Sequence, residues 1–228
     1  MQRKLILTSD GSHSIEIPEL NVTYHSVHGA IQESKHVFIE AGLKSIRPLE
    51  AARCIRIFEM GFGTGLNALL TLIESEKYRQ TIYYETVELF PLNDEEIQSL
   101  NYCHQLQRSD LQALFEQLHN CEWEKETGIT PYFKFKKSKI NLLNLETSGA
   151  SGTFDLIYFD AFAPTTQPEL WTEGIFRKMF LILKPGGVLV TYCSKGTVRR
   201  AMQSAGFTVE KIPGPRGKRE MVRGRRVK

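Results

Sequence analysis

The sequence lacks any run of apolar residues long enough to cross a bilayer, and its longest runs, such as residues 179–183 and 188–190, are short. Its first ten residues carry two cations but no apolar stretch and no small-residue cleavage site, so they do not have the pattern of a secretory signal. With 41% hydrophobic residues over 228 positions, the chain can bury one substantial core. These features predict a single cytoplasmic domain with no membrane partner.

Cysteine is scarce, and no cysteine or histidine has a metal-binding spacing. The four cysteines include no Cys-x-x-Cys pair, which argues against a zinc site and against a disulfide framework. We expect them to be reduced and structural, with Cys54 and Cys193 acting as small hydrophobes in strands. The six histidines show no ligand spacing together with acids, so we predict hydrogen-bonded structural histidines and no metal site.

Acidic residues are almost absent from the C-terminal end. Residues 211–228 hold eight cations and one acid, Glu220, for a net charge of +7, whereas the whole chain has only +3 and the preceding part therefore −4. Clustered Lys and Arg supply the phosphate contacts of nucleic-acid-binding proteins, so this segment predicts an anionic partner. A solvated basic end is the alternative.

Candidate strands and helices alternate along the chain, as in βα units around a parallel sheet. We expect strands at residues 55–59, 82–89, 131–143, 154–160, 188–193, 208–212 and 220–225, and helices at residues 66–76, from 93, within 106–123, at 168–183 and at 197–205. The prediction is a Rossmann-like α/β fold with a mostly parallel seven-stranded sheet and an antiparallel last strand. Residues 1–50 are expected to form a small N-terminal extension that packs on the site, and residues 51–228 a single folding unit.

A glycine-rich turn, Gly61-Phe62-Gly63-Thr64-Gly65, lies between a predicted strand and a predicted helix, and Glu59 stands just ahead of it. Glycine lets the backbone turn tightly and approach a ligand closely. A dinucleotide fingerprint would have its third glycine at position 66, where this chain has Leu66, so a pyrophosphate cofactor is disfavoured. Glu59 favours a cofactor with positive charge near the turn, as in the sulfonium and ammonium groups of S-adenosylmethionine. A purely structural role for Glu59 is the alternative.

Two further acids follow predicted strands. Glu88 ends the second strand, where Rossmann-like sites use an acid to accept hydrogen bonds from ribose hydroxyls; a surface salt bridge is the alternative. Asp160 ends an apolar strand and is expected beside the reactive group of the cofactor, with Phe162 stacking on a planar base and Pro164 stiffening the loop. An aspartate with an ordinary pKa of about 3.9 is a poor base toward an alkylammonium near 10, so we assign Asp160 orientation of an amine first. Capping of the next turn is its structural alternative.

These motifs together resemble the methyltransferase domain of the MnmC family, the tRNA 5-methylaminomethyl-2-thiouridine biosynthesis proteins. The resemblance covers most of the chain and rests on several long segments in the same order. They are residues 24–38 (YHSVHGAIQESKHVF), 59–67 (EMGFGTGLN), 88–92 (ELFPL), 160–172 (DAFAPTTQPELWT), 191–200 (TYCSKGTVRR) and 214–221 (GPRGKREM).

The resemblance implies methyl transfer from S-adenosylmethionine to the aminomethyl nitrogen of 5-aminomethyl-2-thiouridine at the tRNA wobble position. It implies that Asp160 is the catalytic acid, and that the cofactor pocket includes Gly61, Gly63, Gly65, Asn67 and Glu88, with the segment of Ser26, Gly29 and Glu33 closing over the methionine portion. The family's proteins append a flavin-dependent oxidoreductase domain, and this chain ends just after the GKREM segment. Any upstream step that generates the aminomethyl group is therefore expected from another enzyme.

One position departs from the family pattern. Relatives have a Gly-Asp-Ile sequence at the end of the third strand, whereas this chain has Ser138-Lys139-Ile140. Adenine contacts at Lys139 are therefore in question, and a backbone group in place of the side chain is one solution.

Several cations and one aromatic residue are candidates for binding the anticodon arm of tRNA. Lys195, Arg199 and Arg200 begin a predicted helix near the active edge, and surface solvation is an equal alternative for them. Trp171 suits stacking on RNA or, equally, anchoring of its own loop. The remaining candidates are Lys218 and Arg219 of the basic segment.

Two rival functions remain open at this point. A transferase that moves a methyl or aminopropyl group to a free small amine shares the fold and places acids near the same edge. An RNA-binding protein with a degenerate cofactor site is the non-enzymatic rival, which the Lys139 departure keeps open.

Overall fold

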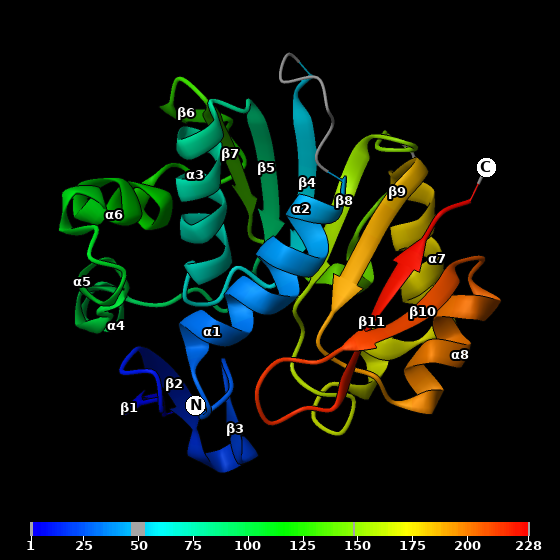
Figure 1. The fold of residues 1–228 in the computed structure, drawn as a ribbon, viewed down its shortest axis with the longest axis horizontal. Helices are drawn as coiled ribbons and strands as arrows, with labels where there is room; N and C mark the ends of the chain where they lie inside the picture. Colours follow the sequence, from blue (N-terminus) through cyan, green and yellow to red (C-terminus); the bar gives the residue numbers. More distant parts are fainter. Residues whose placement is uncertain (1, 47–52, 148, 228) are drawn as a thin grey trace.

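The computed structural model describes residues 2–46, 53–147 and 149–227, and its centre is a twisted sheet of eight strands (Figure 1). The strand order is β10-β11-β9-β8-β4-β5-β7-β6. The bounds are β4 Ile55–Met60, β5 Ile82–Val87, β6 Thr127–Thr130, β7 Phe133–Ser138, β8 Phe154–Phe159, β9 Leu183–Thr191, β10 Thr208–Pro213 and β11 Glu220–Arg225. Strands β9, β8, β4, β5 and β7 pair in parallel, whereas β11, β10 and β6 are antiparallel to their neighbours.

The central strands are buried on both faces, which explains their nearly continuous apolar sequences. Every residue of β8 is buried, and β4 exposes only part of Arg56. Strand β4 lies where the sheet changes direction, because β5 follows it on one side and β8 on the other. In open α/β sheets a crevice forms outside the carboxyl ends of the strands at such a point.

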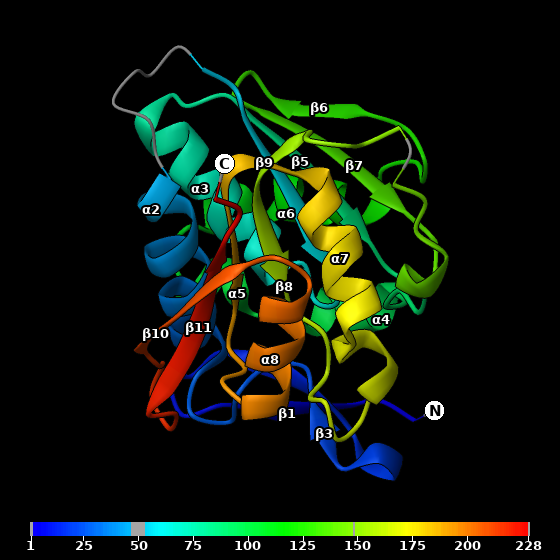
Figure 2. The same cartoon turned by 90° about the vertical axis from the view of Figure 1, so that its right-hand side faces the viewer.

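Helices cover both faces of the sheet (Figures 1 and 2). On one face, α1 (Ala30–Ser34), the π-helical segment η2 (Lys35–Leu43), α3 (Leu66–Tyr78) and α6 (Gln112–Asn120) enclose one part of the core, which includes Phe38, Leu69 and Phe115. On the other face, α7 (Glu173–Ile182) and α8 (Gly196–Ser204) enclose a second part with Phe176 and Met202. The remaining short segments are α2 Lys44–Ile46, α4 Asp94–Ser99, α5 Tyr102–Gln105, η1 Pro18–Leu20, η3 Ser109–Leu111, η4 Leu142–Asn144 and η5 Pro168–Trp171.

The N-terminal residues form a separate small antiparallel sheet, with β1 (Lys4–Leu7), β2 (His13–Ile17) and β3 (Val22–Thr23). In Figure 1 this sheet lies below the carboxyl ends of the central strands, and α1 and η2 then lead the chain back across the main sheet. The described part of the predicted N-terminal extension therefore contains a three-stranded sheet of its own. The predicted boundary at residue 50 lies within residues 47–52, which are outside the described part, so the division into extension and domain stays a prediction.

The fold class is confirmed, but some element bounds were wrong. The sheet has eight strands rather than seven, because β6 pairs with β7 as an additional edge strand, through a hairpin that its Gly128-containing sequence did not suggest. Strand β9 begins at Leu183 rather than at residue 188, so it includes Pro185-Gly186-Gly187. The reason is that Phe154 of β8 pairs with Leu183, before a shift in the register of the two strands. Cys54 is exposed and precedes β4 rather than lying in it, and Cys193 is buried just after β9. No helix in the described ranges is long and apolar enough to span a membrane.

Candidate active site

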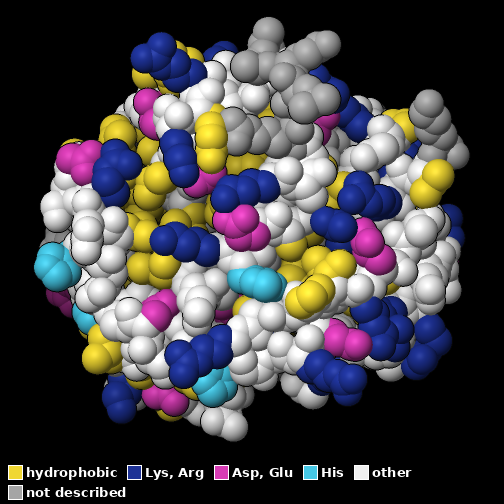
Figure 3. Space-filling model, in the orientation of Figure 1, with side chains coloured by type: hydrophobic (Ala, Val, Ile, Leu, Met, Phe, Trp, Pro, Cys, Tyr) yellow, Lys and Arg dark blue, Asp and Glu magenta, His cyan; other side chains and the backbone are white. Residues whose placement is uncertain are grey.

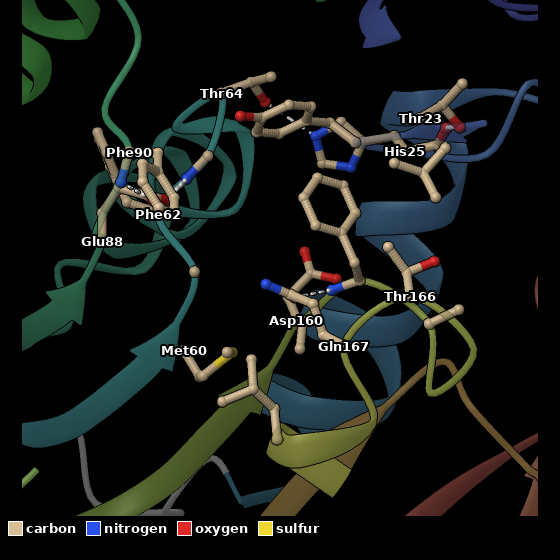
Figure 4. A pocket seen from close by; sticks show the side chains of 18 of the residues that line it. Thr23, His25, Met60, Phe62, Thr64, Glu88, Phe90, Asp160, Thr166 and Gln167 are labelled. Atoms are coloured by element: carbon tan, nitrogen blue, oxygen red, sulfur yellow. Dashed lines mark hydrogen bonds between the residues drawn. The ribbon is translucent and has the colours of Figure 1, made fainter. Parts of the chain in front are cut away.

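A cavity of about 1170 Å³ opens at the carboxyl ends of β4, β5 and β8 and is covered by the N-terminal segment. Figure 4 shows Glu88 and Phe90 on one side of it, Asp160 and Gln167 on the other, and His25 of the N-terminal segment above Asp160 in this view. The predicted site residues that line it come from the covering segment, the loops after strands, the start of α3 and the β10–β11 connection. They are Ser26, Glu33, Gly61, Gly63, Asn67, Glu88, Asp160, Phe162 and Lys218.

The glycine turn has a backbone that other residues rarely adopt. Gly61, Gly63 and Gly65 have φ values of +91°, +52° and +73°. A Cβ at Gly61 would lie 2.9 Å from the backbone oxygen of Asp160, and one at Gly65 would lie 2.7 Å from Nε2 of His119. The turn therefore needs glycine both for its conformation and for space. It delivers the start of α3 to the cavity without a side-chain cap.

Glu88 is tied to the backbone of two loops. Its Oε2 accepts a hydrogen bond from the N–H of Gly63 at 2.9 Å, and its Oε1 accepts one from the N–H of Phe90 at 2.8 Å. A carboxylate oxygen has two lone pairs, so Glu88 retains acceptor capacity toward the cavity while it fixes the glycine turn. The alternative of a surface salt bridge does not apply, because these partners are backbone N–H groups.

Two carboxyl groups share the side-chain amide of Asn67. Its Nδ2 donates to Oε1 of Glu59 at 3.0 Å and to Oδ2 of Asp160 at 2.9 Å. Glu59 is fully buried behind Asn67, and its Oε2 has no hydrogen-bond partner among the residues that the structure describes. The sequence suggested Glu59 as a group that meets the cofactor's positive charge, whereas the structure places it against Asn67 and away from the cavity lining. Asn67 thus orients Asp160 from inside the protein.

Both carboxyl groups are shifted toward their protonated forms. Burial raises the pKa of Glu59 well above its usual value, against the hydrogen bond from Asn67. Burial also raises the pKa of Asp160 to about 7; the Asn67 hydrogen bond lowers it, and the charge of Glu33 raises it further. Such perturbation by burial inside a cleft is typical of functional groups. Asp160 is therefore poised near neutral pH, which its sequence position did not reveal.

The covering segment is held by a buried acid. Glu33 of α1 accepts hydrogen bonds from the backbone N–H of Ser26 at 2.7 Å and from Nζ of Lys218 at 2.7 Å. Gly29, with a φ of +139°, precedes α1, and a Cβ there would lie 2.7 Å from a carboxylate oxygen of Asp10. Lys218 also lies over the ring of Tyr192 at 3.9 Å. The segment is thus fastened across the cavity to the β10–β11 connection.

The loop after β8 is rigidly anchored. The indole N–H of Trp171 donates to the backbone oxygen of Phe162 at 2.8 Å, and Trp171 is only 5% exposed. Stacking of Trp171 on RNA was wrong, because its ring packs on Phe159 in the core; its sequence alternative, anchoring the loop, agrees with the structure. Phe162 lines the cavity edge-on to Tyr24 with ring centroids 5.2 Å apart. Pro164 lies outside the main cavity, in a second depression.

Two buried histidines at the glycine turn were not singled out by the sequence. Nε2 of His25 lies 2.8 Å from the hydroxyl of Thr64, and Nε2 of His119 lies 3.2 Å from the backbone oxygen of Thr64. Burial lowers the pKa of His25 to about 4 and that of His119 to about 3, so both are neutral at pH 7. They support the turn, as hydrogen-bonded structural histidines. In the described ranges no three or more His, Cys, Asp or Glu side chains are grouped to hold a metal ion.

The departure at Lys139 is visible in the cavity wall. Lys139 is exposed and lines the cavity, and its backbone N–H donates to Oε1 of Glu124 at 2.8 Å. That N–H is therefore already engaged. The neighbouring lining residues Ile140, Asn141 and Leu142 provide apolar and amide surface in place of the family's acid.

The site combines three features: a glycine turn after β4 at the switch point of a parallel sheet, Glu88 after β5 and Asp160 after β8. Together they define the class of the protein as a nucleoside-binding transferase with a Rossmann-like fold. Residues 100–227 match a family model described as S-adenosyl-L-methionine-dependent methyltransferase, and the chain belongs to this family. The expected cofactor, S-adenosylmethionine, and the expected class of enzyme are thereby confirmed.

Curated relatives agree with the resemblance to the MnmC family. The chain is 33% identical over 211 residues to the tRNA 5-methylaminomethyl-2-thiouridine biosynthesis bifunctional protein MnmC of Leptospira interrogans, which covers 88% of this chain and 32% of that protein. The MnmC protein of Leptospira borgpetersenii is also 33% identical, over 89% of this chain and 32% of its own length. The chain therefore spans about a third of the length of the curated relatives it matches.

A solved structure supports the fold. The crystal structure of MNMC2 from Aquifex aeolicus aligns with 98% of this chain and 70% of its own, with a TM-score of 0.75 and 22% identity.

The residues present fit S-adenosylmethionine. The glycine turn presents its backbone to the cavity at Gly61 and Gly63, Glu88 has acceptor capacity beside that turn, and the cavity is larger than a single nucleoside needs. When bound, the cofactor supplies a methyl group on a positively charged sulfur.

Proposed function

We propose that this protein transfers a methyl group from S-adenosylmethionine to the aminomethyl nitrogen of 5-aminomethyl-2-thiouridine at the wobble position of tRNA. The observation that carries the proposal is Asp160. Its Oδ2 is fixed by Asn67, and its Oδ1 accepts no hydrogen bond from any residue that the structure describes. One carboxylate oxygen is thus free to accept an N–H bond from an amine in the cavity. The names of the MnmC relatives support the choice of nucleoside.

The residues around Asp160 suit an amine on a planar base. An attacking nitrogen must direct its lone pair at the methyl carbon from roughly 3 to 3.5 Å, and an acceptor of its N–H bonds sets that direction. Phe162 lines the same cavity and offers an aromatic surface for the uracil ring. As the nitrogen gains a methyl group it loses a proton, and a carboxylate with a pKa of about 7 is a better acceptor for it than an ordinary aspartate.

The proposal includes the setting of the reaction. The anticodon arm of tRNA is the macromolecular partner, with Lys195, Arg199, Arg200, Lys218 and Arg219 as candidate contacts. The aminomethyl group is made by a separate upstream tRNA-modifying step, and the reaction takes place in the cytoplasm. The N-terminal extension, residues 1–50, covers the cofactor, as the contacts of Glu33 with Ser26 and Lys218 suggest.

The decisive experiment is mass spectrometry of tRNA nucleosides. Loss of the protein from its host should cause aminomethyl-2-thiouridine to accumulate, and the purified protein with S-adenosylmethionine should convert it to the methylaminomethyl form in that tRNA. Unchanged nucleosides in both experiments would refute the proposal. Methylation of free amines with indifference to tRNA would favour the small-amine transferase instead.

A further inference from the structure

A second cavity of about 330 Å³ lies beside the reactive loop. It is lined by Pro164, by residues that follow β9 and by residues at the start of β11, namely Cys193, Ser194, Lys195, Arg219 and Glu220, together with Ala163, Tyr192 and Lys218. The last three also line the main cavity, so the two cavities share one wall. In Figures 1 and 2 the start of α8 and the loop after β8 lie side by side at this end of the sheet.

Several cations of the C-terminal segment are already engaged by other groups of the protein. Lys211 pairs with Glu220, and Arg223 and Arg225 pair with Glu210. Arg226 donates to backbone oxygens at the end of α7, and Lys218 pairs with Glu33. The excess charge of the segment is therefore not spread evenly over the surface.

Four cations without an ion pair lie at the second cavity and its rim. Among the described residues, Lys195 and Arg219 in the cavity and the neighbouring Arg199 and Arg200 of α8 make no ion pair, and Nε of Arg199 is buried without a hydrogen-bond partner. Figure 3 shows Lys and Arg side chains clustered at the lower right, over the region of β10, β11 and α8. The only acid in the lining, Glu220, is engaged by Lys211. The rim thus has a net positive charge with no internal counterion.

The backbone adds hydrogen-bond donors, which also attract anions. Helix α8 has nine residues and begins at Gly196, directly after the lining residues Ser194 and Lys195, and no side chain caps its N-terminus. The free N–H groups of a helix start attract anions, and here they reinforce the unpaired cations of the cavity. A dianionic or monoanionic phosphate is the ligand that this combination suits best.

We infer that the second cavity binds the backbone phosphate of the nucleotide next to the one that enters the main cavity. The inference rests on the proposed function, because it takes the ligand to be RNA. The shared wall of Ala163, Tyr192 and Lys218 would separate a flipped base on one side from its neighbouring phosphate on the other. This gives the enzyme a way to select a nucleotide within a chain over a free nucleoside or a small amine.

The test compares two lysine substitutions that reverse charge at exposed positions. Lys195→Glu changes the cavity, and Lys77→Glu, at the far end of α3, is the matched control. Binding of an anticodon stem-loop RNA is measured over a range of salt concentrations, with thermal unfolding as a check on folding. Loss of one phosphate contact should reduce the slope of log Kd against log salt by about 0.7 to 0.9. We expect this for Lys195→Glu and for Arg219→Ala, with a raised KM for the stem-loop, and an unchanged slope for Lys77→Glu.

Equal slopes for Lys195→Glu and Lys77→Glu would overturn the inference. The outcome is separable from that of the proposed function, because binding is measured without turnover. A stem-loop that binds with the altered slope but is never methylated would refute the proposed nucleoside and support the phosphate site. If the stem-loop is methylated but all variants keep the slope of the parent protein, the proposed function is supported and the phosphate site is refuted.

Discussion

At the scale of single residues, the central feature of the site is that Asp160 and Glu59 both accept hydrogen bonds from the side-chain amide of Asn67. Because Asn67 donates both amide hydrogens inward, neither acid needs a counter-charge in order to be held in place. A buried carboxyl without a cation shifts toward its neutral form, as both of these do. Burial thus brings the pKa of Asp160 close to neutral pH.

Substitution of Asp160 by alanine should reduce turnover far more than cofactor affinity. General acid–base and orientation effects of this kind are worth roughly 10²- to 10⁴-fold, whereas the contacts of the cofactor with the glycine turn remain. We expect kcat for tRNA methylation to fall by about that factor and the Kd of S-adenosylmethionine, measured by calorimetry, to change little. Equal losses in both would contradict the role assigned to Asp160.

Cofactor binding should release protons near neutral pH. Free Asp160 has a pKa of about 7, and a sulfonium cation beside it favours the carboxylate, so binding lowers that pKa and the group loses its proton. Calorimetry at pH 7 in buffers of different ionisation enthalpy should report this release for S-adenosylmethionine. S-adenosylhomocysteine, which lacks the sulfonium, is the control ligand and should release fewer protons. An identical release for Asp160→Asn would exclude Asp160 as the source.

Asn67→Leu tests the positioning role of the amide. It leaves two buried carboxyl groups without their shared donor, which costs about 1 to 3 kcal/mol of the free energy of unfolding. The lost hydrogen bond also raises the pKa of Asp160 further, so the acidic limb of the pH profile of kcat/KM should move to higher pH. Ser75→Ala, a buried polar change on the same helix, is the control and should leave the profile in place. A loss of stability with no movement of the profile would mean a purely structural role.

At the scale of elements, the turn between β4 and α3 is the most constrained part of the site. Its glycines let the chain reverse beneath the backbone of Asp160, so the cofactor turn and the reactive loop are in direct contact. Histidines from two other segments, His25 and His119, buttress the same turn through Thr64. Changes in the turn should therefore affect cofactor binding and the position of Asp160 together.

Gly61→Ala is expected to weaken cofactor binding by about tenfold or more, equivalent to about 1.4 kcal/mol. A Cβ there would press on the Asp160 backbone oxygen at 2.9 Å, in addition to the cost of about 1 to 2 kcal/mol for a non-glycine residue with positive φ. Gly152→Ala is a matched control, because Gly152 has a φ of +61° but no atom within 4 Å of its Cβ position. Thermal unfolding and calorimetry should show a stability loss for both variants and a loss of affinity for Gly61→Ala alone. Equal affinities would show that the crowding is relieved without cost.

At the scale of the whole molecule, the N-terminal covering segment and the β10–β11 connection meet over the active site. Glu33 of the covering segment and Lys218 of the β10–β11 connection are 185 positions apart in the sequence, yet form a partly buried ion pair. Lys218 also packs on Tyr192, whose hydroxyl donates to the backbone oxygen of Ala161 at 2.8 Å. The side chain of Lys218, between β10 and β11, therefore contacts the N-terminal segment directly and the reactive loop through Tyr192.

A double-mutant cycle with Glu33→Gln and Lys218→Met should give a coupling free energy of about 0.5 to 3 kcal/mol in chemical unfolding. The reason is that the acid is largely buried, with its side chain 10% exposed, and so little screened by water. The exposed pair of Lys125 and Glu122, with side chains 66% and 70% exposed, is the control and should show coupling near zero. Additive effects at Glu33 and Lys218 would mean that the two segments are held independently.

Local sequence patterns predicted the class of fold well. A buried strand that runs into a glycine turn and a helix has a recognisable pattern over a few residues, and Gly61 and Gly63 of that turn line the cavity; their contact with the cofactor stays a prediction. Glu88 and Asp160 follow apolar strands, and the ends of parallel strands meet at one edge of the sheet. Strand β6 and the start of β9 were missed, because pairing with a neighbouring strand, rather than local composition, determines where these strands begin.

What the sequence determined alone is the class of fold, the glycine turn and the acids at strand ends, since each depends on neighbours along the chain. Tertiary structure decided which groups meet: it put Glu59 behind Asn67, Trp171 in the core and Lys218 on Glu33. It also decided the protonation of Asp160, because a pKa depends on burial and on charges brought together from distant segments. These properties depend on distances in space between segments that are far apart in the sequence, so local sequence patterns do not predict them.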